Sequence, residues 1–271
     1  MIRRAFTMVE VLVVIAIIAV LASIILPLAS SAQSAALRAT CMSHLRQMSL
    51  GAMSWATEHE GAFPPGLLHG NDRDCLSGDV RAWDWNHLPS GTVRPGLLWS
   101  HVSGVNALGV LDCPTAIGVG PSWDGDPVTG YNYNVAFIAA ESRTPSPDDD
   151  GLGAWDLLAP KDNLDGETHL RLSQCRRRAE TALFGVGGRR DGVNKFMRSP
   201  ENVGPQYDIA YAGSQAFPNG SNVARVDGSV ITVRQPFKGM HADALPGWIV
   251  DQLGFPHNGF LSDDASAYDP R

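Results

Sequence analysis

The chain has 271 residues, of which 44% are hydrophobic and 18% charged, and its formal net charge is −7 at pH 7. A negative balance of this size argues against nonspecific binding of nucleic acid by the chain as a whole. The sequence has no G-x-S-x-G, H-E-x-x-H or phosphate-binding-loop motif, so no enzyme class that depends on these motifs is indicated, and we expect no catalytic activity.

The first predicted element is a membrane-spanning helix. An apolar run from Val11 to Leu26 follows the basic pair Arg3 and Arg4. A span needs about 20 mostly apolar residues, which predicts a transmembrane segment over about residues 8–29. The positive-inside rule leaves the N-terminus in the cytoplasm and exports the rest of the chain. A cleaved secretory signal or a plain signal anchor is the alternative, because small residues after the apolar core mimic a cleavage site.

The acidic residue Glu10 stands at the start of this apolar run. A carboxylate near the centre of a bilayer costs roughly 2.5 to 3.5 kcal/mol on insertion scales, so such a residue indicates a function and a partner. Neither a cleaved signal nor a plain anchor needs a carboxylate at this place.

The helical pattern continues beyond the apolar run. Between Ser30 and Glu58 there is no proline and one glycine, Gly51. Small or apolar residues recur there at three- and four-residue steps, which predicts an amphipathic helix that packs on its own domain. Gly61 and the following prolines end the pattern, so one long helix is predicted over residues 6–59. The stripe consists of Ala35, Ala39, Met42, Leu45, Ser49, Ala52 and Ala56.

Residues 60–271 are predicted to form one exported α+β domain. Short apolar runs alternate with glycine- and proline-rich turns, which is typical of antiparallel β-structure with long loops. The clearest hairpin covers residues 222–233, where Asp227 and Gly228 between β-branched runs predict a type I′ turn. The predicted fold class is therefore α+β, with a long N-terminal helix packed on an antiparallel sheet.

Three groups of side chains in this domain are weak candidates for binding. Acidic clusters offer oxygen ligands for Ca²⁺, although solvated turns explain them as well. Two arginine runs, 176–178 and 189–190, flank a predicted strand, either as a basic patch or as solvated loop ends. Trp83 and Trp85 would share one face of an extended strand, suited to a glycan or to core packing. The acidic residues are Asp148, Asp150 and Asp156, with a second group of Asp263, Asp264 and Asp269.

Residues 5–18, AFTMVEVLVVIAII, resemble the class III signal of type IV pilins and pseudopilins. The resemblance implies that prepilin peptidase cuts between Ala5 and Phe6, so that residues 1–5 are a leader, and that Phe6 is then N-methylated. Glu10 corresponds to the family's acidic residue, which implies a role in assembly, and Pro27 to its helix-kinking proline. Ala5 departs from the family's preference for glycine before the cut.

Residues 41–65, CMSHLRQMSLGAMSWATEHEGAFPP, are similar to a pilin-like family abundant in planctomycetes, whose members often carry an H-X9-DG motif. The Asp-Gly pair is present here, but Phe217 replaces the histidine. All four cysteines follow the predicted span, in an oxidising compartment under this topology. Four cysteines allow three full connectivities. The resemblance implies the pair Cys41–Cys113, which leaves Cys75 with Cys175; four free thiols are the alternative.

These resemblances imply a structural subunit of a type IV pilus-like or type II secretion pseudopilus-like filament. Its partners would be other pilin-like subunits, prepilin peptidase and the inner membrane, with no specific nucleic acid and no cofactor apart from the calcium candidate. The precursor would cross the inner membrane once, and the mature domain would be periplasmic or on an extracellular filament. A membrane-anchored module that binds a glycan or protein is one alternative, and a membrane-anchored secreted hydrolase is another.

Overall fold

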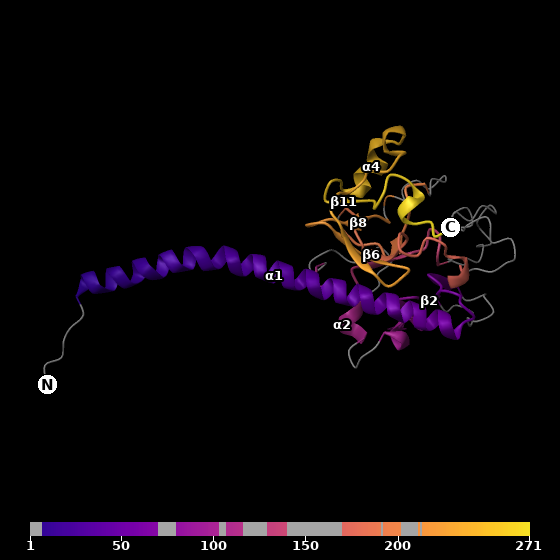
Figure 1. Ribbon diagram of the computed structural model, residues 1–271, viewed down its shortest axis with the longest axis horizontal. Coiled ribbons are helices and arrows are strands. Elements are labelled where there is room, and N and C mark those ends of the chain that lie inside the picture. The colour runs from indigo at the N-terminus through magenta and orange to yellow at the C-terminus, as the bar shows by residue number, and fades with distance from the viewer. Residues whose placement is uncertain are drawn as a thin grey trace. The chain divides into compact units, whose positions relative to one another are not determined.

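The computed structural model describes residues 7–69, 80–102, 107–115, 129–139, 170–190, 192–201, 211 and 213–271 (Figure 1). The chain divides into two compact units, Met1–Thr40 and Cys41–Arg271. The first unit contains the N-terminal part of helix α1, and the second contains the rest of this helix together with all of the strands.

Helix α1 runs unbroken from Met8 to Glu58, over 51 residues, which agrees with the helix predicted over residues 6–59. Pro27 lies inside it. The helix ends as predicted at a glycine: the Gly61 N–H donates to the Ala56 carbonyl at 2.7 Å, and Gly61 has a φ of 87°. This bond satisfies one of the carbonyls that a helix end leaves without a partner.

The last five turns of α1 form one wall of the domain core. The predicted stripe is buried from Leu45 onward, whereas Ala35 and Ala39 are exposed. Leu45, Met48 and Ala52 belong to a large apolar cluster with residues of the central sheet. The Ser49 hydroxyl also donates to the Arg225 carbonyl at 3.0 Å. Small side chains on this face let the helix backbone approach the sheet closely.

The central sheet has five strands in the order β10-β9-β6-β5-β7. Neighbouring strands are antiparallel, except that β5 and the two-residue β7 are parallel. Both β5 and β6 are buried along their whole length, and β6 confirms the strand predicted between the two arginine runs. The bounds are β5 Tyr131–Asn134, β6 Ala182–Val186, β7 Phe196–Met197, β9 Ser221–Arg225 and β10 Val230–Val233.

The predicted hairpin of β9 and β10 is confirmed, but its turn type was wrong. In a type I′ turn both central residues need a positive φ, whereas only Gly228 in this turn has one, at 83°. The Gly228 N–H donates to the Arg225 carbonyl at 3.0 Å, and the Arg225 N–H donates to the Ser229 carbonyl at 2.8 Å. This is a type I turn followed by a glycine bulge. Tertiary contacts favour it, because Val226 is buried and its N–H donates to Thr181.

Two smaller sheets and several short helices complete the domain. A second apolar cluster joins α4 to the segment that follows β8, and it includes Phe217. The remaining elements are β1 Leu67–His69, β2 Val80–Ala82, β3 Trp85–His87 and β4 Val93–Pro95 in one sheet, β8 Gln215–Ala216 and β11 Asn258–Gly259 in another, α2 Ala107–Leu111, α4 Gly247–Leu253, and the 3-10 turns Trp99–His101, Leu172–Gln174, Ala242–Ala244 and Ala265–Ala267.

Candidate functional site: the N-terminal helix

The first half of α1 presents apolar side chains on all of its faces. An 18-residue window has a mean hydropathy of 3.2, and none of that window is buried. Within the described ranges α1 is the one helix long and apolar enough to cross a membrane. A helix that is apolar all round needs lipid or other apolar helices about it. Side chains at least half exposed include Val11, Leu12, Val14, Ile15, Ile18, Leu21, Ile25 and Leu28.

Glu10 forms a reciprocal hydrogen-bonded pair with Thr7 at the start of the helix. The Thr7 N–H and hydroxyl both donate to Glu10 Oε2, at 2.8 and 2.7 Å, and the Glu10 N–H faces Thr7 Oγ1 at 3.3 Å. This is a capping box, the T-x-x-E arrangement that satisfies two otherwise unpaired N–H groups of a helix end. Sequence reasoning missed Thr7, although Thr7 and Glu10 stand at the required spacing.

The capping box engages one oxygen of the Glu10 carboxylate. Oε2 accepts both hydrogen bonds from Thr7, and among the described residues no donor reaches the other carboxylate oxygen, Oε1. A carboxylate has room for about four hydrogen bonds over its two oxygens. Glu10 can therefore cap its own helix and accept a cation from another chain at the same time. The proposed cleavage residues, Ala5 and Phe6, lie outside the described residues.

Cys41 and Cys113 come together in the core of the domain. Cys41 lies on α1 and Cys113 follows α2; their sulfur atoms are 4.0 Å apart, and both side chains are buried. A disulfide needs about 2.05 Å, so these sulfurs are adjacent but not bonded. The hydrogen bond with Cys113, together with burial, raises the pKa of the Cys41 thiol. Burial likewise raises the pKa of Tyr131, whose ring packs in the same cluster.

The other predicted pair, Cys75 with Cys175, is not tested, because Cys75 lies outside the described residues. Cys175 is buried, and its thiol donates to the Arg171 carbonyl at 3.7 Å. Burial raises the pKa of this thiol to about 11.

Of the two alternatives for Trp83 and Trp85, core packing agrees with the structure, and an exposed glycan-binding face does not. Trp83 is fully buried, and its ring meets those of Tyr133 and Phe184 at centroid distances of 5.9 and 5.6 Å. Trp85 is partly buried against Trp99, and the centroids of their rings are 4.6 Å apart. Residue 83 lies in a bend between β2 and β3, so the alternation of a regular strand does not apply to it.

The structure describes only the second of the two acidic groups. Asp148, Asp150 and Asp156 lie outside the described residues. Asp264 instead caps a 3-10 turn by accepting from the Ser266 N–H at 2.9 Å, and Asp269 pairs with Arg271. Across the described ranges no group of three His, Cys, Asp or Glu side chains is placed to hold a metal ion.

The two arginine runs flank β6 at its opposite ends, as its bounds require. A strand of five residues spans roughly 16 Å, and the second run has a partner of its own, since Arg190 pairs with Asp251. Arg177 pairs with Glu180 at 2.6 Å, and Arg178 donates to the Leu172 carbonyl. These contacts agree with the interpretation of the first run as loop ends with local partners.

Comparison with known proteins identifies one family motif in this chain, at its N-terminus. Residues 1–26 match a family profile described as the prokaryotic N-terminal methylation motif. No curated protein and no solved structure matches the chain in the corresponding searches. The matched segment contains Ala5, Phe6 and Glu10 and continues into the apolar helix, so it implies a membrane-anchored precursor that prepilin peptidase processes.

Proposed function

We propose that this chain is a structural subunit of a type IV pilus-like or type II secretion pseudopilus-like filament. The observation that carries the proposal is the methylation motif at residues 1–26, continuous with a fully exposed apolar helix. The same helix continues from Cys41 into the core of a β-sheet domain. Such a chain can pack its apolar segment against copies of itself and present its domain at the surface of the filament.

The proposed life cycle begins in the inner membrane. Arg3 and Arg4 keep the N-terminus cytoplasmic, and the domain is exported to the periplasm or to the filament surface. Prepilin peptidase removes residues 1–5, and the α-amino group of Phe6 is methylated. Phe6 then carries a positive charge at the membrane edge, four residues before Glu10.

Assembly is proposed to use this charge. Glu10 Oε1 of one subunit accepts the Phe6 ammonium of its neighbour, while Oε2 keeps its bonds to Thr7. Two unit charges about 4 Å apart attract by about 4 kcal/mol at an effective dielectric of 20. Because each charge alone is unfavourable in lipid, the pairing favours association and defines the axial register between subunits.

We also propose that Cys41 and Cys113 form a disulfide in the exported protein. The support is their adjacency, with sulfurs 4.0 Å apart in a compartment that favours oxidation. Oxidation by thiol–disulfide exchange would join the two sulfurs and pass two electrons and two protons to the disulfide of an envelope oxidant, which becomes a pair of thiols. Because burial disfavours the reactive thiolate in the folded domain, we expect the bond to form while the domain folds.

The processing step predicts a defined N-terminus. The mature protein purified from membranes should begin with N-methyl-Phe6, and Ala5→Gly should be cut at least as efficiently, because glycine is the residue that the peptidase signal prefers. Intact-mass and N-terminal peptide analysis measure both. A native chain that begins at Met1, or after Ala22 or Ala32, would contradict the proposal.

A further inference from the structure

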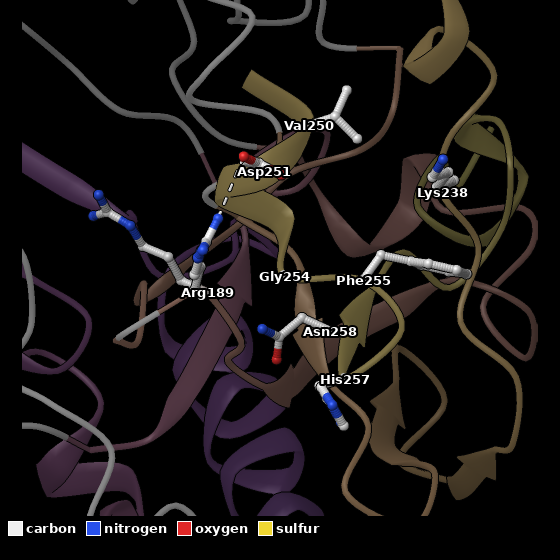
Figure 2. A pocket seen from close by; sticks show the side chains of 9 residues that line it. Arg189, Lys238, Val250, Asp251, Gly254, Phe255, His257 and Asn258 are labelled. Carbon is white, nitrogen blue, oxygen red and sulfur yellow. Dashed lines mark ion pairs between the residues drawn. The ribbon is translucent and has the colours of Figure 1, made fainter. Parts of the chain in front are cut away.

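An open pocket of about 690 Å³ lies between the loop after β6, helix α4 and the segment that leads into β11 (Figure 2). Its volume falls in the range of about 300–1,000 Å³ that is usual for small-molecule sites. The lining combines cationic, carboxylate, amide and aromatic side chains, including Arg189, Lys238, Asp251, Phe255 and Asn258.

The backbone around this pocket is held by contacts between distant segments. The Arg190 N–H donates to the Gln252 carbonyl at 3.0 Å, which ties the β6 loop to α4. Asn258 begins β11, which pairs with β8. A Cβ on Gly188 would lie 2.4 Å from the Ala216 nitrogen, so this close approach of the β6 loop to β8 requires glycine. The pocket is therefore built into the fold.

The lining is positive in a chain whose net charge is −7. Arg189, Arg190 and Lys238 contribute three positive charges, against one carboxylate, Asp251. Arg190 contacts Asp251 at 3.5 Å, in a pair whose side chains are 55% and 73% exposed. Exposed pairs of this kind contribute about 0–1 kcal/mol, so the pair can rearrange around a ligand at little cost. A net positive pocket selects an anion.

An aromatic ring stands beside these charges. Phe255 is 42% exposed, and the Lys238 ammonium is 6.0 Å from its ring centroid. In Figure 2 Arg189 lies on the opposite side of the pocket from Lys238 and Phe255, with Asn258 between them. This arrangement offers an apolar face to one side of a ring-shaped ligand and cations to its acidic groups.

We propose that this pocket binds uronate units of an acidic polysaccharide. Arg189 and Lys238 would contact sugar carboxylates, Phe255 would cover a sugar face, and Asp251 and Asn258 would bond hydroxyl groups. A single-stranded nucleic acid fits less well, because such strands are bound along extended grooves, whereas this is a single pocket whose lining includes the carboxylate of Asp251, which repels phosphate groups. The inference does not require that the chain polymerise.

The test is a binding titration of the full-length protein in detergent with a fluorescently labelled hexauronate. Maltohexaose is the neutral probe of equal length, and a labelled single-stranded oligonucleotide is the phosphate-bearing probe. We expect hexauronate binding that weakens as NaCl is raised, and maltohexaose binding at least tenfold weaker. The double variant Arg189→Gln/Lys238→Gln should bind hexauronate at least tenfold more weakly, and Phe255→Ala about fivefold more weakly.

The matched control is Arg94→Gln/Arg234→Gln, which removes two exposed charges away from the pocket lining and should stay within twofold of wild type. Circular dichroism of each variant checks that the domain is folded. Absent hexauronate binding, or equal loss in the control, would overturn the proposal. Tighter binding of the oligonucleotide that depends on Arg189 and Lys238 would reassign the pocket to a phosphate polymer and so also overturn it.

Discussion

Replacing Glu10 with alanine should reduce incorporation of the chain into filaments by tenfold or more. Membrane insertion should persist, since the apolar run from Val11 to Leu26 is unchanged, and so should cleavage at residues 5 and 6. The loss is expected because the Phe6 ammonium of the neighbouring subunit no longer has a counter-charge. The pairing contributes up to about 4 kcal/mol, and a loss of about 1.4 kcal/mol already lowers an association constant tenfold. Blotting of filaments sheared from cells, against total membrane protein, measures the effect.

The capping box supplies a matched pair of variants that separates charge from helix capping. Glu10→Gln keeps a side chain that can complete the box but removes its charge, whereas Thr7→Ala keeps the charge and removes the hydroxyl that bonds Oε2. We expect Glu10→Gln to resemble Glu10→Ala and Thr7→Ala to assemble nearly as wild type. Glu10→Asp should fall between them, because its shorter side chain reaches less far.

The opposite pattern would identify capping as the role of Glu10. If Glu10→Gln assembles normally and Thr7→Ala does not, the carboxylate acts on its own helix and the charge-pairing mechanism is wrong. Normal filament yield from Glu10→Ala would leave apolar helix packing as the assembly force. Intact-mass analysis of each variant confirms that residues 1–5 are removed, since Thr7 lies close to the proposed cut.

Loss of the Cys41–Cys113 link should lower the free energy of unfolding of the oxidised protein by up to about 4 kcal/mol. The two cysteines are 72 positions apart, and in the chain-entropy model a bond that closes a loop of this size restricts the unfolded chain by about that amount. Cys113→Ala should show this loss in denaturant titrations. Non-reducing peptide mapping of the wild type should recover the two cysteines in one linked peptide pair.

The control for this effect is the response to reductant in a Cys175→Ala background. In this background a reductant should lower the free energy of unfolding of the protein that keeps Cys41 and Cys113. It should not change that of the variant in which both cysteines are alanine. Because both thiols are buried, reduction should need partial unfolding and proceed slowly under native conditions. Four alkylatable thiols in freshly isolated protein would contradict the prediction.

The long helix could be predicted from the sequence because its causes are local. Apolar residues from Val11 to Leu26, small residues at helical spacing up to Ala56, and the glycine and prolines after Glu58 act within a few residues of one another. The same holds for the β9–β10 hairpin, where Asp227 and Gly228 stand between β-branched runs. The adjacency of Cys41 and Cys113 came from resemblance to a family and had no local signal of its own.

Tertiary contacts decided the features that depend on residues far apart in the chain. The hairpin turn took its bulged form because Val226 packs in the core and bonds to Thr181. Trp83 became a core residue because the chain bends before β3 and turns the ring toward Tyr133.

The pocket at Arg189 and Lys238 likewise joins residues about fifty positions apart, which periodicity and spacing cannot relate. By itself the sequence determined the membrane helix and its processing signal, since hydropathy and short motifs act along the chain. Apart from the adjacency of Cys41 and Cys113, only the structure decided which side chains meet across the domain, since packing acts through space.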